Sequence, residues 1–188
     1  MKHKIITLFE LSNKYKILEH SENVARVNIE LAEKFNLDKA KCETAAYCHD
    51  ISGIMNPLNM LEYAESHNMY IDTAEAKYPF ILHQRLSALI AETILDITDE
   101  EILSPICHHT TLKANPSDYD MALFVADKLA WDQDGTPPFY DDIKEALEIS
   151  LYHAAYAYIK YVTDHNMILY PHKWFIEAKE WLEGKINE

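Results

Sequence analysis

The sequence predicts an all-α protein, and two observations carry that prediction. Only 3 of its 188 residues are glycine, where average usage of about 7% would give roughly 13. Few segments alternate strictly between apolar and polar residues, which is the pattern of a half-buried strand, whereas apolar residues recur at helical spacing in several long segments. Both observations favour helices over sheets.

The length and charge of the chain limit its organisation and its partners. A chain of 188 residues suits a single core, so we expect one domain spanning residues 1–188. The 17 Lys and Arg residues against 31 Asp and Glu residues give a net charge of −14. This charge argues against nucleic-acid binding through neutralisation of phosphates, although a small phosphorylated ligand remains compatible if a metal supplies positive charge.

The cysteines and the apolar runs indicate a compartment. Cys42, Cys48 and Cys107 form no C-x-x-C pair, and an odd number without disulfide-like spacing suggests a reducing environment. Small buried apolar residues are the simpler interpretation of all three, ahead of metal ligation. The N-terminal apolar stretch is shorter than a signal peptide, and no run approaches the roughly 18 residues of a membrane span. We therefore expect a cytoplasmic protein without a membrane segment.

The first half of the chain contains three predicted helices. Apolar spacing predicts the first strong helix from Ser21, and a short turn then leads to a second helix with Asp38 as its N-cap. This second helix runs toward His49 and Asp50. The third is expected within residues 78–97, with its leucines and isoleucines facing inward.

The second half contains four more predicted helices. The first begins with Thr98 and Glu101 in capping-box positions and is bent or weakened at Pro105, and the next is capped by Ser117. A long helix is then expected from about Asp141 to Asp164, and a last one from near Pro171 to near Gly184. The acidic, proline-containing segment 132–138 is expected to form a surface loop at the rim of a site.

Titratable side chains occupy inward positions on several of these helices. His49 and Asp50 end an apolar helix, and His20 precedes the first strong one. Other members lie three or four residues from apolar positions of their own helices and therefore share the inward face. The complete set is His20, His49, Asp50, His83, His109 and Asp127.

This set predicts a metal centre. A buried, unpaired carboxylate is costly, but two carboxylates beside four imidazoles are explained if they share cations. Mixed ligation of this kind suits Fe, Mn, Zn or Co, and open coordination positions would bind a phosphate oxygen and acidify a water. Any one of the six residues taken alone is more simply a hydrogen-bonded core residue or a cap, so the prediction depends on the ordered set. The other histidines are expected at the surface or at helix ends, with His108 undecided; they are His3, His67, His153, His165 and His172.

The order His20, His49–Asp50, Asp127 resembles the signature of the HD-domain metal-dependent phosphohydrolases. The segments "LEHSENVARVNIELAEKFNLDKAKCETAAYCHDI", "ILHQRLSA", "ICHHTT" and "LFVADKL" resemble, in order and spacing, the YqeK family of bacterial HD proteins. The closing segment "NMILYPHKWFIEAKEWL" is also similar, so the resemblance runs from about Leu18 to Leu182.

The resemblance implies a fold and an activity. The fold is an HD-domain helical bundle with a metal centre in its core, the metal-binding part spanning about 18–130 and the C-terminal helices about 139–186. The implied reaction is symmetrical hydrolysis of diadenosine tetraphosphate to two ADP, with one or two bound ions, iron first and Mn, Co, Zn or Ni as others that suit the ligands. By position the six residues named above would be the ligands. Asp50 and His83 would be catalytic, since Asp50 could also orient or deprotonate the attacking water.

The chain departs from the family around the substrate. A lysine expected shortly after His49–Asp50 is absent from "ISGIMN", "QRLS" replaces a glycine-containing run, "HTTG" appears as "HTTLKAN", and "LAWDQDGTPPF" replaces an acidic-proline-arginine segment. Arg85, Thr110 and Lys128 are therefore the predicted contacts to the nucleotide, with Lys113 and Thr111 as others. Trp131 and Phe139 are candidates for stacking on a base, although aromatic rings at helix ends more often form the edge of the core.

Three functions agree with these residues. The first is a dinucleoside tetraphosphatase, and the second is a related phosphohydrolase acting on another nucleotide, such as a nucleoside monophosphate or a guanosine polyphosphate. The third is a metal- and nucleotide-binding module with little turnover. The tyrosine-rich segment 150–162 suits either the core or the face of a homodimer, since periodicity does not distinguish them.

Overall fold

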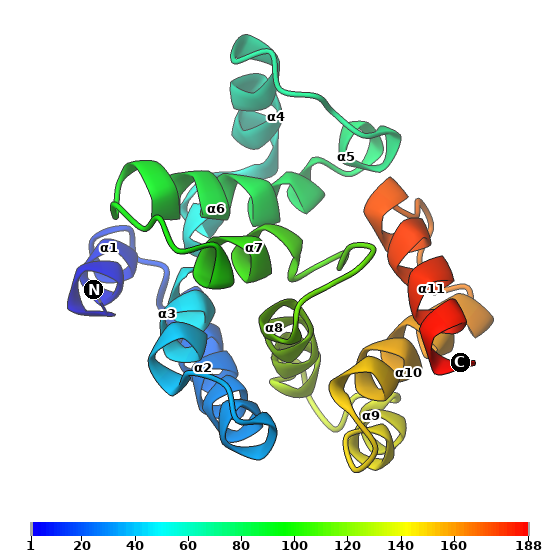
Figure 1. Ribbon diagram of the computed structural model, residues 1–188. Coiled ribbons are helices and arrows are strands. Elements are labelled where there is room, and N and C mark those ends of the chain that lie inside the picture. The colour runs from blue at the N-terminus through cyan, green and yellow to red at the C-terminus, as the bar shows by residue number, and fades with distance from the viewer. Residues whose placement is uncertain (1, 188) are drawn as a thin grey trace.

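The computed structural model describes residues 2–187, and over this range the chain forms eleven α-helices, two 3₁₀-helices and no strand (Figure 1). The all-α prediction is confirmed. The α-helices are α1 Lys2–Leu11, α2 Tyr15–Phe35, α3 Lys39–Cys48, α4 Pro57–Ser66, α5 Thr73–Lys77, α6 His83–Thr93, α7 Glu100–His108, α8 Asp118–Leu129, α9 Tyr140–Ala146, α10 Leu151–Asp164 and α11 Lys173–Ile186; the 3₁₀-helices are η1 Ile51–Ile54 and η2 Pro79–Leu82.

Helix α8 lies in the middle of the bundle (Figure 1) and contacts α2, α3, α7 and α10. Every residue from Met121 to Ala126 is fully buried, so this helix is covered on all sides, as expected for an element that is apolar around its whole circumference. Helices α2 and α3 pack together on one side of it, and α10 joins it to α9 and α11 on the other. The C-terminal end of α8 therefore lies between the α2–α3 pair and the group formed by α9, α10 and α11.

Local capping signals predicted two helix starts correctly and one incorrectly. The Asp38 side chain accepts hydrogen bonds from two backbone N–H groups of α3, and Ser117 forms a capping box with Asp120 at the start of α8. The prediction for Thr98 was wrong, because Asp99 is the N-cap of α7 and accepts a bond from the N–H of Glu101. Pro105 lies inside α7, which continues to His108.

Tertiary packing moved two other boundaries. Helix α2 begins at Tyr15, so His20 lies within its second turn and does not precede it as expected; Ile17 and Leu18 pack against the core and extend the helix backwards. The expected long helix over 141–164 is two helices, α9 and α10, separated at Ser150. Ser150 is extended (φ −170°, ψ 169°), and its side chain caps α10 by accepting from the N–H of His153.

The cysteines are packing residues in this fold. Cys42 and Cys48 are buried in α3 and Cys107 is partly buried in α7, and all three are free thiols. Burial raises the pKa of Cys42 and of Cys48 to about 12, which disfavours the thiolate that binds metals. The expectation of small buried apolar residues is confirmed for Cys42 and Cys48. Across residues 2–187 there is no helix long and apolar enough to cross a membrane.

Candidate metal centre

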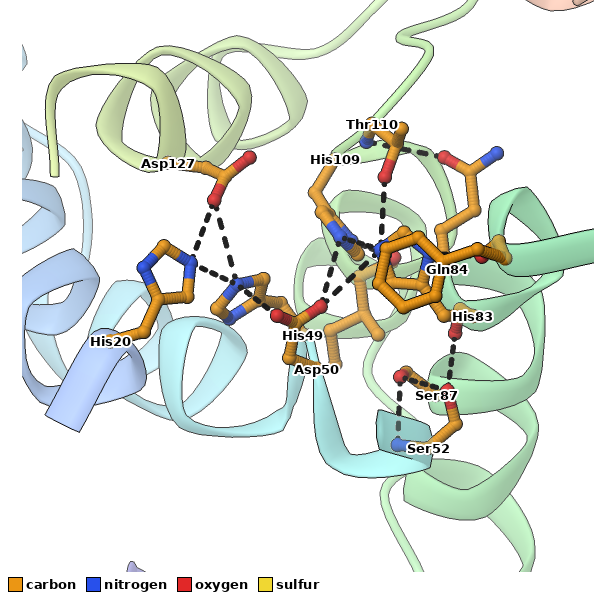
Figure 2. Close-up of polar contacts among 12 residues, drawn as sticks. His20, His49, Asp50, Ser52, His83, Gln84, Ser87, His109, Thr110 and Asp127 are labelled. Atoms are coloured by element: carbon orange, nitrogen blue, oxygen red, sulfur yellow. Dashed lines mark hydrogen bonds and ion pairs between the residues drawn. The ribbon is translucent and has the colours of Figure 1, made fainter. Parts of the chain in front are cut away.

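The six side chains of the predicted cluster come together from five places in the chain (Figure 2). His20 comes from α2, His49 and Asp50 from the end of α3, His83 from the first residue of α6, His109 from the end of α7, and Asp127 from α8. His49, His83 and His109 are almost completely buried. Only His20, Asp50 and Asp127 keep side-chain exposures of 14%, 20% and 15%, so the cluster opens on one side.

Asp50 lies between two pairs of imidazoles. Its Oδ1 is 3.3 Å from Nε2 of His83 and 3.4 Å from Nε2 of His109. Its Oδ2 is 3.5 Å from Nε2 of His49, which is 3.3 Å from Nε2 of His20. Two groups that could each hold an ion result, and they share Asp50: His20, His49 and Asp50, and Asp50, His83 and His109.

Asp127 completes the first of these groups. Its Oδ1 is 3.0 Å from Nε2 of His20 and 3.7 Å from Nε2 of His49. Its Oδ2 accepts a 2.5 Å bond from the Nζ of Lys128, the next residue of α8. One oxygen therefore faces the cluster, and the other is held by a cation.

Backbone carbonyls fix the tautomers of the three buried histidines. In each, Nδ1 lies within hydrogen-bond distance of the carbonyl three residues earlier; the pairs are His49 with Ala46 (2.7 Å), His83 with Phe80 (2.6 Å) and His109 with Ile106 (2.8 Å). A carbonyl only accepts, so Nδ1 must carry the proton, and Nε2 of each neutral ring points a lone pair at the centre. This is the arrangement in which histidine ligates metals, with its second nitrogen donating to a backbone oxygen.

Several acceptor atoms approach one another closely in this cluster, and a cation between them would explain it. The Nε2 atoms of His83 and His109 are only 2.8 Å apart, and the buried Oδ1 of Asp50 beside them has no hydrogen-bond partner. Acceptors brought this close repel one another unless a proton or a metal ion lies between them. The donor set, imidazole nitrogens with carboxylate oxygens, fits a transition-metal ion.

The electrostatics of the cluster favour positive charge. Burial opposes protonation of His49, but the charges of Asp50 and Asp127 outweigh it and raise its pKa to about 9. Burial would raise the pKa of Asp50, but the neighbouring imidazoles hold it far below its ordinary value. Burial and the charge of its imidazole neighbours lower the pKa of His109 to about 4, against the pull of Asp50. Both carboxylates are thus ionised, and the raised pKa of His49 shows that they draw positive charge to the centre, which a metal ion would supply in place of that proton.

Two hydrogen-bonded groups that sequence reasoning missed hold the cluster in place. The Oε1 of buried Gln84 accepts from the N–H of Thr110 (3.2 Å), the N–H of Thr111 (3.3 Å) and the Thr111 hydroxyl (3.2 Å). Ser52, just after Asp50, donates through its hydroxyl to the His83 carbonyl at 2.9 Å and through its N–H to Ser87 at 3.1 Å. The only sequence signal for Gln84 and Ser87 was polarity on the inward face of a helix, which many caps and surface residues share.

The predicted nucleotide contacts separate into two groups. Thr110 and Lys128 lie at the centre, with the Thr110 hydroxyl 3.1 Å from Nε2 of His83 and Lys128 also bonded to the His109 carbonyl at 3.2 Å. Arg85 does not join them. Its guanidinium donates to the Glu75 carboxylate at 2.9 Å and to the Tyr70 carbonyl at 2.7 Å, and it lines a different cavity beside His108 and Lys113.

A cavity of about 380 Å³, here called the metal-centre cavity, opens over the cluster. It is lined by His20, Asp50, His83, His109 and Asp127 and by Lys128, Trp131, Asp132 and Phe139, among others. Asp132 at the start of the 132–138 loop thus reaches the rim, as expected. Phe139 is buried against Trp131, with ring centres 5.8 Å apart, so Trp131 is the more accessible of the two rings.

The chain is similar to proteins of one family. Residues 17–132 match the HD domain. A protein in the pepC 5′ region of Lactococcus lactis subsp. cremoris, described as uncharacterized, is 36% identical over 80% of this chain and 77% of its own length. Two proteins named symmetrical bis(5′-nucleosyl)-tetraphosphatase also match: one from Staphylococcus aureus, 31% identical over 69% of this chain and 66% of its own, and one from Bacillus subtilis, 26% identical over 75% and 74%.

A solved structure has the same fold. The crystal structure of a predicted HD superfamily hydrolase involved in NAD metabolism from Clostridium acetobutylicum superposes with a TM-score of 0.85 over 98% of both chains, at 22% identity. At that identity the likeness concerns the fold alone. It extends over the helices that follow the matched HD segment.

Proposed function

This chain belongs to the HD domain family, and we propose that it is a metal-dependent phosphohydrolase that cuts dinucleoside tetraphosphates symmetrically, diadenosine tetraphosphate giving two ADP. The observation that supports it most is the position of Asp50 between two pairs of imidazoles. The names of the relatives from Staphylococcus aureus and Bacillus subtilis support the choice of substrate.

We assign the metal to the six clustered residues, as one or two ions that share Asp50. When bound, such ions polarise a phosphoryl oxygen and lower the pKa of a water at neutral pH. Iron is the ion that the YqeK resemblance implies, and Mn, Co, Zn and Ni suit the same nitrogen and oxygen ligands.

The chain's own groups provide the remaining chemistry. Asp50 and His83 both line the metal-centre cavity, where the Asp50 carboxylate can orient the attacking water. The Thr110 hydroxyl can donate to a phosphate oxygen. Lys128 lies partly buried beside Asp127 and brings a fixed positive charge toward the tetraphosphate in a protein whose net charge is −14.

Product analysis tests this proposal. Protein reconstituted separately with iron, manganese and cobalt is incubated with diadenosine tetraphosphate, and nucleotides are separated by chromatography. We expect ADP as the sole product, and no bound metal and no product from Asp50→Ala. Asp142→Ala, which changes an exposed aspartate of α9, is the matched control and should behave as wild type.

Other outcomes select the alternatives. Intact substrate with metal demonstrably bound would reject this reaction, and a panel of nucleoside monophosphates and guanosine polyphosphates would then identify another nucleotide substrate. Tight nucleotide binding without product from any of them would indicate a binding module. Retention of both metal and activity by Asp50→Ala would refute the assignment of the centre.

A further inference from the structure

A second cavity lies beside the metal-centre cavity. Its volume is about 460 Å³, and the two share four lining residues, Thr110, Tyr158, Met167 and Ile168. Both volumes fall near or within the ~300–1,000 Å³ of small-molecule sites. We call the second cavity the distal chamber; its own lining includes Lys77, Tyr78, Ile81, Leu169, Tyr170 and Phe175.

Several exposed apolar side chains line the distal chamber. Tyr78 is 58% exposed, Tyr170 47% and Leu169 83%, although they come from segments about ninety residues apart in the chain. Met167 and Phe80 are exposed as well. Of the twelve large apolar residues that are exposed within residues 2–187, these five line one of the two cavities. Exposed apolar residues concentrated around a hollow indicate a ligand surface more than scattered ones do.

The polar groups of the distal chamber are few and unevenly placed. Thr110 lies at the junction, since its hydroxyl is 3.1 Å from Nε2 of His83 in the metal cluster. Lys77, an exposed cation, is the one lysine or arginine of its lining, and the buried His172 also lines it, with its Nε2 3.6 Å from the Glu75 carboxylate. The donors of Thr111 are already bonded to Gln84. The chamber therefore offers aromatic faces and apolar surface, with its contact to the metal centre on one side.

A flat heterocycle suits this surface better than another phosphate would. Nucleic-acid bases stack on tyrosine rings whatever their sequence, because every base has a π-face. A phosphate would instead require several donors or cations, and the distal chamber supplies one lysine and one histidine whose Nε2 faces the Glu75 carboxylate. The two cavities adjoin at Thr110 and Tyr158, so phosphates attached to a base in the chamber would lie beside the metal centre.

We propose that the distal chamber binds the base of one nucleoside of the substrate while the tetraphosphate crosses the metal centre and the other nucleoside extends toward Trp131. This rests on the proposed function, because only a substrate with two bases occupies both cavities. Most of the chamber is formed by residues 77–81 and 167–175. The second of these segments lies outside residues 17–132, which match the HD domain.

A binding measurement tests the chamber without any catalysis. Metal-free protein carrying ¹³C-labelled methyl groups on isoleucine and leucine is titrated with millimolar adenosine, which has no phosphate. We expect saturable shifts of the Ile81 and Leu169 methyls, while Leu58 and Ile149, exposed elsewhere, stay unchanged. Tyr170→Ser should abolish the shifts. Absent shifts at Ile81 and Leu169 would overturn the proposal, whatever the enzyme hydrolyses.

Kinetics provide the second readout. In metal-loaded protein, Tyr170→Ser should raise KM for diadenosine tetraphosphate about tenfold, the effect of one lost stacking contact, and leave kcat nearly unchanged. Tyr15→Ser, which removes a tyrosine of similar exposure far along the chain from the chamber, should change neither. A KM unaffected by Tyr170→Ser would reject the chamber as a substrate site. If wild-type protein released no ADP, the proposed reaction would fail while the adenosine titration still decided the chamber.

Discussion

At the scale of single residues, Asp50 is the member of the cluster on which both candidate ion sites depend. His49 and Asp50 are adjacent polar residues at the end of a helix whose preceding residues are buried, and such a pair draws attention because burying it is costly. The direction of Arg85 was not visible. Two residues after His83 it could face the centre or the opposite side, and the buried Glu75 carboxylate, which is distant in sequence, decides for the latter.

Gln84 provides a residue-scale prediction. Replacing it with leucine leaves the N–H groups of Thr110 and Thr111 without their acceptor, and each unpaired buried donor costs ~1–3 kcal/mol. We expect Gln84→Leu to lower the free energy of unfolding by about 2 kcal/mol or more, measured by urea denaturation, and to reduce kcat because Thr110 loses its position. Gln84→Glu keeps the acceptor oxygens and should recover most of both. Equal loss in the two variants would contradict this role.

At the scale of elements, helix starts that depend on a local side chain were predictable, whereas breaks set by packing were not. The apolar series Ile143, Leu147, Leu151 and Ala154 continues at helical spacing straight through the break between α9 and α10, and all four residues are buried. Periodicity therefore predicts one helix. The extended backbone of Ser150 redirects the chain while both pieces keep their apolar faces inward.

A buried carboxylate joins three elements, α5, α6 and α11. Glu75 of α5 is completely buried and bonds Arg85 of α6, and His172, the N-cap of α11, lies 3.6 Å from it. His172 is therefore at a helix end, one of the two positions expected for it, and it is buried there. Burial alone would raise the pKa of Glu75, but His172, the N–H of Asp72 and Arg85 together lower it.

Removing this carboxylate should have a large, pH-dependent effect. Glu75→Ala leaves the partly buried guanidinium of Arg85 with the Tyr70 carbonyl alone, so we expect a loss of about 2–3 kcal/mol of unfolding free energy at pH 7. Because the folded-state pKa is lowered, the contribution is present above the ordinary value near pH 4.3 and is lost as pH falls. The difference between wild type and variant, measured by denaturation at several pH values, should therefore shrink in acid.

A surface pair is the control for that experiment. Glu177 faces Lys173 at 3.6 Å with both side chains exposed, and such pairs contribute ~0–1 kcal/mol. Glu177→Ala should change stability little at any pH. A loss as large as that of Glu75→Ala would show that the effect is not specific to the buried group.

At the scale of the whole molecule, the centre draws its side chains from helices on several sides of α8. Residues from α2, α3, α6, α7 and α8 supply the cluster, and α10 with the segment after it adds to the walls of both cavities. The tyrosine-rich segment 150–162 is partly buried against the core through Tyr152, Tyr156, Tyr158 and Tyr161. That residues 1–188 form a single domain, and that the protein forms a homodimer, both remain predictions.

Because the ligands come from five elements, metal should stabilise the entire fold. An ion that binds only the folded state, at a hundred times its Kd, adds about 2.7 kcal/mol, which for a chain of this size raises Tm by roughly 5–10 °C. We expect this rise in scanning calorimetry when manganese or cobalt is added to metal-free protein. Asp50→Ala should show almost none of it. A wild-type Tm independent of metal would argue against the centre.

The thiol of Cys48 can report how often α3 separates from the helices around it. The thiol immediately precedes His49, is completely buried, and has a pKa raised to about 12 by burial. A thiol reagent can reach it only when α3 separates from its neighbours, and that same separation takes His49 and Asp50 out of the cluster. The rate at which Cys48 is alkylated therefore follows how often the centre comes apart, and any ion that closes the centre must also slow that reaction.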